Sequence, residues 1–439
     1  MRSGGARSST SDTAGAGAGA GAVGGVATAG APPFRLPGIH FAAAVCFLVA
    51  GSVGLVLVSP ALASGAFLTP RVVAVTHLFT LGWITTSIMG ALYQFLPVAL
   101  GVAVRSERVA YGTFAVYAPG VAVFVGAMGG AHVDAMLVGA VAVAAGLLLF
   151  VGNLTATLAR AAHRDVTWWA LTLADVFLFL TLLLGLLLAG NLRWGYIGAK
   201  RVIGVGTHLH IALVGWVLMV IVGVAHRLLP MFLLSHGADE RAGRAAVALL
   251  GTGVTALAAL HHTHLAARKW LPAALILAGL AAFLAQARSF YRHRRKPVLD
   301  AGLKLAAGGL TLLGLAALLS VPVLVRGIGS PHLAATYVLL LILAISLFVA
   351  AHYYKIVPFL VWYHRFSSLI GRAEMPQVAD LYSGRWAAGA GVLLLAGTLG
   401  LTASVAGGWA AGARAAALVF AAGTAVEAVQ MAGLARRRP

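Results

Sequence analysis

The chain has one cysteine and few charged residues. With Cys46 alone, it can form neither a disulfide framework nor a cysteine-ligated zinc or iron–sulfur site. Charged residues make up 10% of the 439 residues, hydrophobic residues make up 61%, and the mean hydropathy is +0.95. These values exclude an ordinary water-soluble globular protein. The sequence therefore predicts a polytopic membrane protein, in which any metal must be held by histidine.

Residues 1–33 lack bulky apolar side chains, so we expect a disordered cytoplasmic tail there. Residues 34–439 are expected to form one membrane domain. Apolar windows of about 20 residues, long enough to cross a bilayer, occur twelve times. The predicted fold is an all-α bundle of about 12 transmembrane helices. The expected spans are 39–59, 72–100, 109–128, 132–156, 168–190, 203–233, 243–265, 270–289, 300–324, 331–363, 386–405 and 408–434.

Acidic residues are scarce, with 11 Asp and Glu against 31 Lys and Arg. The resulting charge of +20 could suggest nucleic acid, but the basic residues are scattered through short loops rather than gathered in one stripe. They are concentrated in the N-terminal tail and the even-numbered loops. The positive-inside rule then places both termini in the cytoplasm. We therefore expect a multi-pass protein of the cytoplasmic membrane. Its partner is expected to be the lipid bilayer, and we expect no binding of nucleic acid.

Two stretches of the chain repeat one pattern, in which Thr-His-Leu, Gly-Trp, Gly and Leu-Pro follow one another. His77 and His210 each stand twenty residues before the proline of their copy. A third, degraded copy ends at Pro358, with Val338 in the position of the histidine. The spacing of the copies predicts three quasi-repeats of four helices. An ionisable residue inside a membrane is costly, so these histidines mark a candidate functional site.

Six histidines are expected at one depth, the outer third of the membrane. Counted in chain order, the second, sixth and tenth predicted spans (72–100, 203–233 and 331–363), called helices 2, 6 and 10 here, run inward. The seventh (243–265), helix 7, runs outward. Neutral imidazole is the commonest metal ligand, although each ring could instead bond a backbone carbonyl or lie in a solvated loop. Residues 208 and 210 point roughly 200° apart on a helix and cannot both ligate one metal. The six are His77, His208, His210, His261, His262 and His332.

A second polar group is expected near the inner face. These side chains either snorkel to cytoplasmic water or serve an inner metal or proton-uptake role. Two carboxyl groups inside predicted spans either carry protons or pair with arginines. The inner group is Tyr93, Gln94, His226, Arg227, His352, Tyr354 and Lys355, and the carboxyl groups are Asp175 and Glu427.

The layout of histidines near the outer starts of helices 2, 6 and 10, with a His-His pair ending helix 7, resembles subunit I of the haem–copper oxidases and nitric-oxide reductases. The resemblance covers residues 39 to about 434 and includes twelve spans with both ends inside. It implies a b-type haem and a copper ion. The implied haem ligands are His77, His210 and His332, and the implied copper ligands are His208 or His210 with His261 and His262.

The chain also departs from the pattern of that family. Helix 10 carries His332 without a second histidine two residues later, and helix 6 has neither the oxidase tyrosine nor the reductase acid. The paired arginines expected between helices 11 and 12 are reduced to Arg414. These departures indicate a divergent member, with a haem-dependent oxidoreductase activity left open.

Three functions compete on this sequence. The first is a haem protein that passes electrons to oxygen or nitric oxide, or senses such a gas, with a cytochrome or quinol donor and partner membrane subunits. The second is a transporter for copper or another metal, whose histidines form a transit site. The third is an assembly or scaffold subunit that kept the fold without the chemistry.

Overall fold

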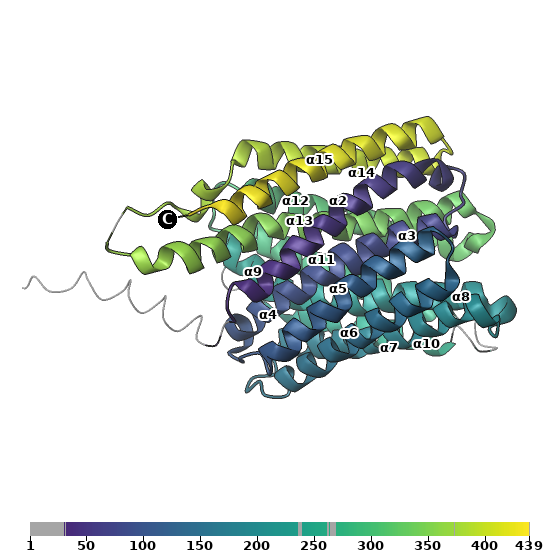
Figure 1. Cartoon of the computed structure of the whole chain (residues 1–439), viewed down its shortest axis with the longest axis horizontal. Coiled ribbons are helices and arrows are strands. Elements are labelled where there is room, and N and C mark those ends of the chain that lie inside the picture. Colours follow the sequence, from purple (N-terminus) through teal and green to yellow (C-terminus); the bar gives the residue numbers. More distant parts are fainter. Residues whose placement is uncertain are drawn as a thin grey trace, which may run out of the picture.

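The fold is a bundle of twelve long apolar helices (Figure 1). Among the residues that the structure describes there is no strand, so the predicted all-α membrane bundle is confirmed. Spans that consist of one α-helix are α2 (Arg35–Ala63), α5 (Glu107–Gly129), α6 (Val133–Leu158), α7 (Val166–Trp194), α10 (Arg241–Leu260), α11 (Trp270–Arg292), α12 (Ala301–Arg326), α14 (Gly384–Ala406) and α15 (Ala410–Arg436).

The structure is a computed structural model that describes Gly30, Thr263 and residues 32–235, 239–260, 269–372 and 374–438. The tail expected at residues 1–33 lies almost entirely outside these ranges, as do His261 and His262.

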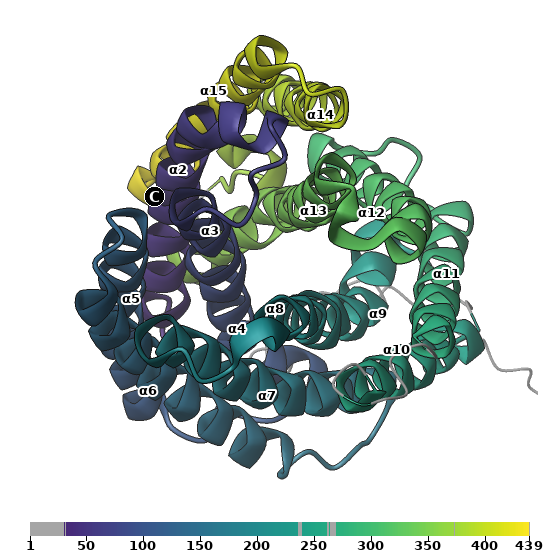
Figure 2. The ribbon, with the colours of Figure 1, turned by 90° about the vertical axis from the view of Figure 1, so that its right-hand side faces the viewer.

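Three spans lie at the centre of the bundle (Figure 2). Their apolar windows are 67%, 72% and 83% buried inside the protein, against 50% or less for the other spans. A helix that is apolar on all sides is stable only when other helices surround it or lipid covers it. The central spans are α3 (Pro70–His77) with η1 (Leu78–Thr85) and α4 (Thr86–Leu100); α8 (Arg201–His210) with η3 (Ile211–Leu218) and α9 (Met219–Leu233); and α13 (Pro331–Phe366).

The two spans that carry the sequence repeat share an unusual backbone. In each, the α-helix ends at the histidine, His77 or His210, and the next eight residues form a π-helix, η1 or η3. π-Helices are rare and concentrate at functional sites. The third central span, α13, is α-helical throughout and has Val338 in the histidine position. The π-helices therefore occur in the two central spans that kept the histidine.

Glycine allows three pairs of outer helices to pack backbone against backbone. The pairs are α5 with α6, α10 with α11, and α14 with α15. A Cβ atom added at the contacting glycine would lie 2.4–2.9 Å from a backbone nitrogen of the partner helix, which is too close for any other residue. The recurrence of this contact is consistent with a four-helix repeat, which stays a prediction. The contacts are Gly139 to Phe124, Gly253 to Ile276 and Gly397 to Phe420.

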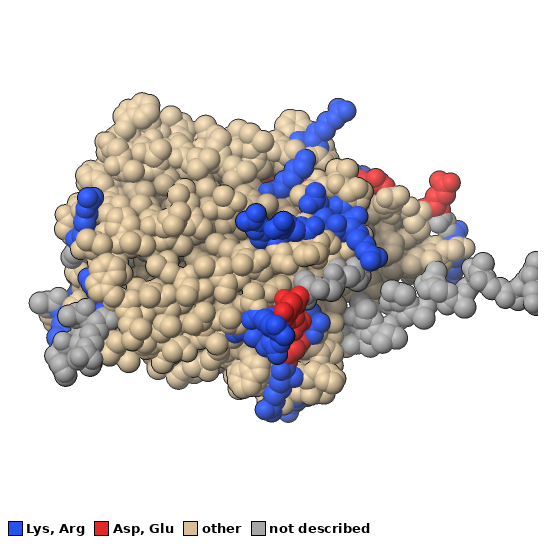
Figure 3. Space-filling model, turned by 180° about the vertical axis from the view of Figure 1, so that it is seen from behind, with Lys and Arg blue, Asp and Glu red and all other residues tan. Residues whose placement is uncertain are grey.

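The two ends of the bundle differ in charge (Figure 3). A broad band of uncharged surface separates them, and Lys and Arg gather towards the end that bears the termini. The opposite end, where α8 begins, is called the α8 end below. The uncharged band supports contact with a lipid bilayer, while the direction of insertion stays a prediction from the positive-inside rule.

Candidate functional site

His77 is held in one orientation by the helix that carries it. Its Nδ1 lies 2.8 Å from the carbonyl oxygen of Val73, one turn earlier in α3. A carbonyl can only accept, so Nδ1 carries the proton and Nε2 keeps a free lone pair. The ring meets Phe124 of α5 edge to face, with 5.2 Å between ring centroids. This fixed tautomer, with the second nitrogen bonded to a carbonyl, is typical of a metal-ligating histidine.

His208 lies against the same cavity as His77 but comes from a different central helix, α8. Its Nδ1 is buried and has no hydrogen-bond partner among the described residues. Gly185 of α7 makes room for the ring, because a Cβ atom there would lie 3.2 Å from Cε1 of His208. Buried polar atoms in native proteins normally have a partner, so this unpaired nitrogen needs an explanation.

The cavity between the two histidines has a volume of about 430 Å³. Its walls come from α3 and η1, α5, α6, α7, and α8 with η3, and they are mainly aliphatic. Thr85 and Trp216 line its deep part, where the indole Nε1 lies 3.4 Å from the hydroxyl oxygen of Thr85. Arg201 and His132 line it at the α8 end. Cofactor sites commonly measure about 300–1,000 Å³ and are mostly apolar, so this cavity suits a large apolar ligand.

His210 does not face this cavity. Its Nδ1 lies 2.8 Å from the carbonyl oxygen of Gly206, as in His77, but its Nε2 lies 3.3 Å from the hydroxyl of Tyr337 on α13. The two rings are nearly parallel, with 6.2 Å between centroids. His208 and His210 thus point towards different neighbours, because residues two apart on a helix lie on nearly opposite faces. The structure pairs His77 with His208 at one cavity rather than with His210.

His332 does not join this pair either. It stands at the start of α13 beside the turn between α14 and α15, where a Cβ atom on Gly408 would lie 3.5 Å from its Nε2. It does not line the cavity of His77 and His208. The structure therefore brings neither His210 nor His332 to His77 as a second ligand.

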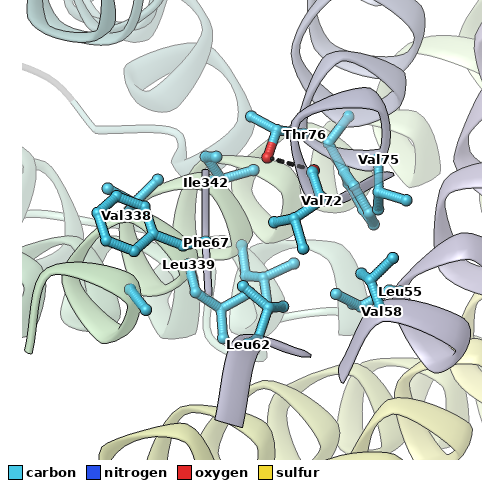
Figure 4. Close-up of a pocket in the computed structure, with 13 residues that line it drawn as sticks. Leu55, Val58, Leu62, Phe67, Val72, Val75, Thr76, Val338, Leu339 and Ile342 are labelled. Atoms are coloured by element: carbon cyan, nitrogen blue, oxygen red, sulfur yellow. Dashed lines mark hydrogen bonds between the residues drawn. The ribbon is translucent and has the colours of Figure 1, made fainter. Parts of the chain in front are cut away.

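The space among α2, α3 and α13 has no metal-ligating side chain among the residues that line it. A small pocket of about 40 Å³ lies there, with apolar walls that include Val338, the residue in register with His77 and His210 (Figure 4). Its polar side chain is Thr76, whose hydroxyl donates to the carbonyl of Val72 at 3.0 Å. The third copy of the repeat has become a packing surface.

The predicted copper site falls partly outside the described residues, because two of its ligands, His261 and His262, lie there. Within the described ranges there is no group of three or more His, Cys, Asp or Glu residues arranged to hold a metal ion. The copper assignment of His208 with these two histidines stays a prediction.

The inner polar residues do not converge on one site. His226 and His352 each bond a carbonyl oxygen one turn earlier, at 2.6 and 2.7 Å. Arg227 pairs with Asp165, while Lys355 pairs with Asp300. The two candidate carboxyl groups are both buried. Asp175 accepts from Thr155, and both oxygens of Glu427 lack a partner within the described ranges.

Comparison with protein-family models and with curated proteins finds no match to this chain. The resemblance to the haem–copper oxidases therefore rests on the sequence pattern alone.

Most residues that line the cavity were not predicted from the sequence, among them the two that pack on the histidine rings and one further histidine. Phe124, His132 and Gly185 lie on outer helices or a loop, outside the repeated pattern. His132 carried a signal, because it is a histidine at the outer start of the predicted span 132–156.

Proposed function

We propose that this chain is a haem-binding integral membrane protein in which His77 and His208 hold a b-type haem. The observation that carries the proposal is that two histidines from two central helices line one large, mainly aliphatic cavity. This pairing replaces His210 by His208 in the ligand set that the sequence suggested.

The residues present fit such a group in three respects. His77 offers an Nε2 lone pair that accepts no hydrogen bond from the described residues, and the ring of His208 lines the same cavity. The volume of about 430 Å³ and the aliphatic walls suit a porphyrin. At the α8 end, Arg201 supplies a cation for the acidic edge that a haem carries.

Haem iron supplies one-electron redox chemistry, tuned by its axial ligands and its surroundings. Here the chain would contribute the imidazoles of His77 and His208 and a cavity with mainly aliphatic walls. If His77 and His208 both held the group, it would supply electron transfer rather than a binding position for a gas. The arrangement therefore favours electron transfer, with a cytochrome or quinol as the proposed donor, over direct reduction of oxygen or nitric oxide.

The test is the absorption spectrum of the purified protein, with haem and copper quantified. We expect one haem per chain and a low-spin spectrum. His77→Ala and His208→Ala should each lose that spectrum, while His210→Ala, a matched histidine one half-turn away, should retain it. Retention of the low-spin band in both His77→Ala and His208→Ala would contradict the proposal. Stoichiometric copper without haem would instead support the metal-transport function.

A further inference from the structure

The cavity of His77 and His208 opens at one end of the bundle. Lining residues at the α8 end, including His132, Leu192 and Arg201, are exposed to solvent. In the deep part, Trp216 and Val217 are 2% and 1% exposed. A large ligand can therefore reach the two histidines from the α8 end, whereas packed side chains separate them from the end that bears the termini.

The mouth of the cavity is positively charged. Arg201 and His132 line it, and exposed Arg71 and Lys200 each adjoin a lining residue in the chain. No Asp or Glu belongs to the described lining. Asp134 stands near the mouth, but its carboxylate accepts from Arg193 at 2.9 Å. The mouth thus presents cations without nearby carboxylates to neutralise them, apart from that one pair.

We propose that the cavity takes up and releases its ligand through this mouth, and that Arg201 and His132 bind the carboxylates of that ligand. The inference rests on the proposed function, in which the ligand is a haem and the carboxylates are its two propionates. An apolar body with an acidic edge matches an aliphatic cavity with a cationic rim, and charge-assisted hydrogen bonds are the strong ones in such contacts.

Uptake through this mouth confines ligand exchange to one side of the membrane. Ligand exchange takes place with the compartment at the α8 end, which the positive-inside rule predicts to be the outside of the cell. Exchange from the end that bears the termini would require the packed central helices to separate. Arg201 acts as a positioning residue, since it lies at the rim and the histidines lie deeper.

The test compares two ligands on two variants of the full-length protein in detergent. Ferric protohaem carries both carboxylates, whereas its dimethyl ester carries neither. Removing one exposed charge-assisted contact should raise the rate of protohaem loss in Arg201→Gln about fivefold. The same variant should leave the loss of the dimethyl ester unchanged. Arg193→Gln is the matched control, because Arg193 pairs with Asp134 and does not line the cavity.

The outcomes separate this proposal from the one on which it rests. Absence of a haem spectrum with either ligand overturns the proposed function. A normal spectrum, with equal effects of Arg201→Gln on protohaem and on the ester, overturns the role of the rim alone. Protohaem binding weakened equally by Arg193→Gln also overturns it. Tight binding of a fatty acid, with displacement of haem, would reassign the site to an acidic lipid and overturn both.

Sidedness is tested separately with sealed vesicles of known orientation. Haem bound to albumin cannot cross the bilayer as a complex, so it presents haem to one face of the protein. We expect the low-spin spectrum to develop in vesicles whose α8 end faces the medium. Equal rates in both orientations would overturn uptake through the mouth.

Discussion

At the scale of single residues, hydrogen bonds to the preceding turn decide what each buried histidine offers. His77 and His210 both donate from Nδ1 to a carbonyl four residues earlier, so each keeps an acceptor at Nε2. In His210 that acceptor meets the hydroxyl of Tyr337, whereas in His77 it has no hydrogen-bond partner among the described residues. Identical local chemistry thus gives two different environments, because the neighbouring helix supplies the partner.

The carboxylate of Asp300, which stands just before α12, accepts three hydrogen bonds. It caps α12 by accepting from the backbone nitrogen of Leu303 at 3.0 Å, and it also accepts from Lys296 at 2.7 Å and from Lys355. Burial alone would raise the pKa of Asp300, but the hydrogen bonds from the two lysines and the backbone hold it below its usual value. Folding therefore favours the charged form.

A pH dependence follows for Asp300→Asn. A carboxyl group with a lowered native pKa stabilises the fold above its unfolded pKa of about 4, and that stabilisation is lost as the pH falls through the native value. The variant should melt below the wild type at pH 7, and the difference should shrink below about pH 4. Thermal unfolding in detergent measures both. Asp134→Asn, with its side chain 83% exposed, should change little, and a pH-independent difference for Asp300→Asn would refute the assignment.

At the scale of elements, the π-helices set the direction of the histidines. Each places an additional residue in a turn, so the part of the span before it is rotated relative to the part after it. Thr80 lies within η1 and lines the cavity. The π-helix therefore links the end of α3, with His77, to the packed inner half of the span, which is formed by α4.

Deleting Thr80 removes one residue from the wide turn and should restore a continuous α-helix, which changes the backbone that carries His77 and the cavity-lining Leu81. We expect the deletion variant to insert into the membrane and to lose the haem spectrum. Thr80→Val is the control, because it keeps the number of residues and most of the side-chain volume, and it should bind haem. Wild-type haem content after the deletion would show that the π-helix does not orient the ligand.

At the scale of the whole molecule, the two ends of the bundle differ. Arginine and lysine gather at the end that bears the termini, and the candidate site opens at the other end. Hydrophobic burial cannot choose between the two directions of insertion, since the uncharged band is common to both. The charge asymmetry must decide the direction.

Single-cysteine labelling tests this orientation. With Cys46→Ser as background, Lys200→Cys at the α8 end and Arg437→Cys near the C-terminus provide exposed sites at opposite ends. A membrane-impermeant maleimide should label Lys200→Cys in intact cells, and Arg437→Cys should react only after the membrane is opened. The reverse pattern would invert the topology and move the proposed exchange to the cytoplasm.

Much of this architecture could be predicted from the sequence. The twelve spans were expected from apolar length alone, and their ends in the structure differ by a few residues in most cases. The repeat singled out His77 and His210, and the structure gives both the same backbone, an α-helix followed by a π-helix. Helical spacing also correctly separated His208 from His210.

The pairing of the histidines could not be predicted in this way. Sequence similarity made His77 and His210 equivalent, and equivalent positions on two helices invite the idea that they share a ligand. In the bundle each central helix turns this position towards a neighbour, so His77 lies at the cavity of His208, His210 meets Tyr337, and Val338 packs beside α3. Three aligned positions therefore occupy three different interfaces.

By itself, the sequence determined that this protein is a histidine-bearing membrane bundle. Apolar length, charge asymmetry and residue spacing act along the chain and need no knowledge of neighbours. Only the tertiary structure decided which histidines share a cavity, how large that cavity is and at which end it opens. Those properties depend on rotation about each helix axis and on the side chains that the adjacent helices present, and both are settled by packing between distant parts of the chain.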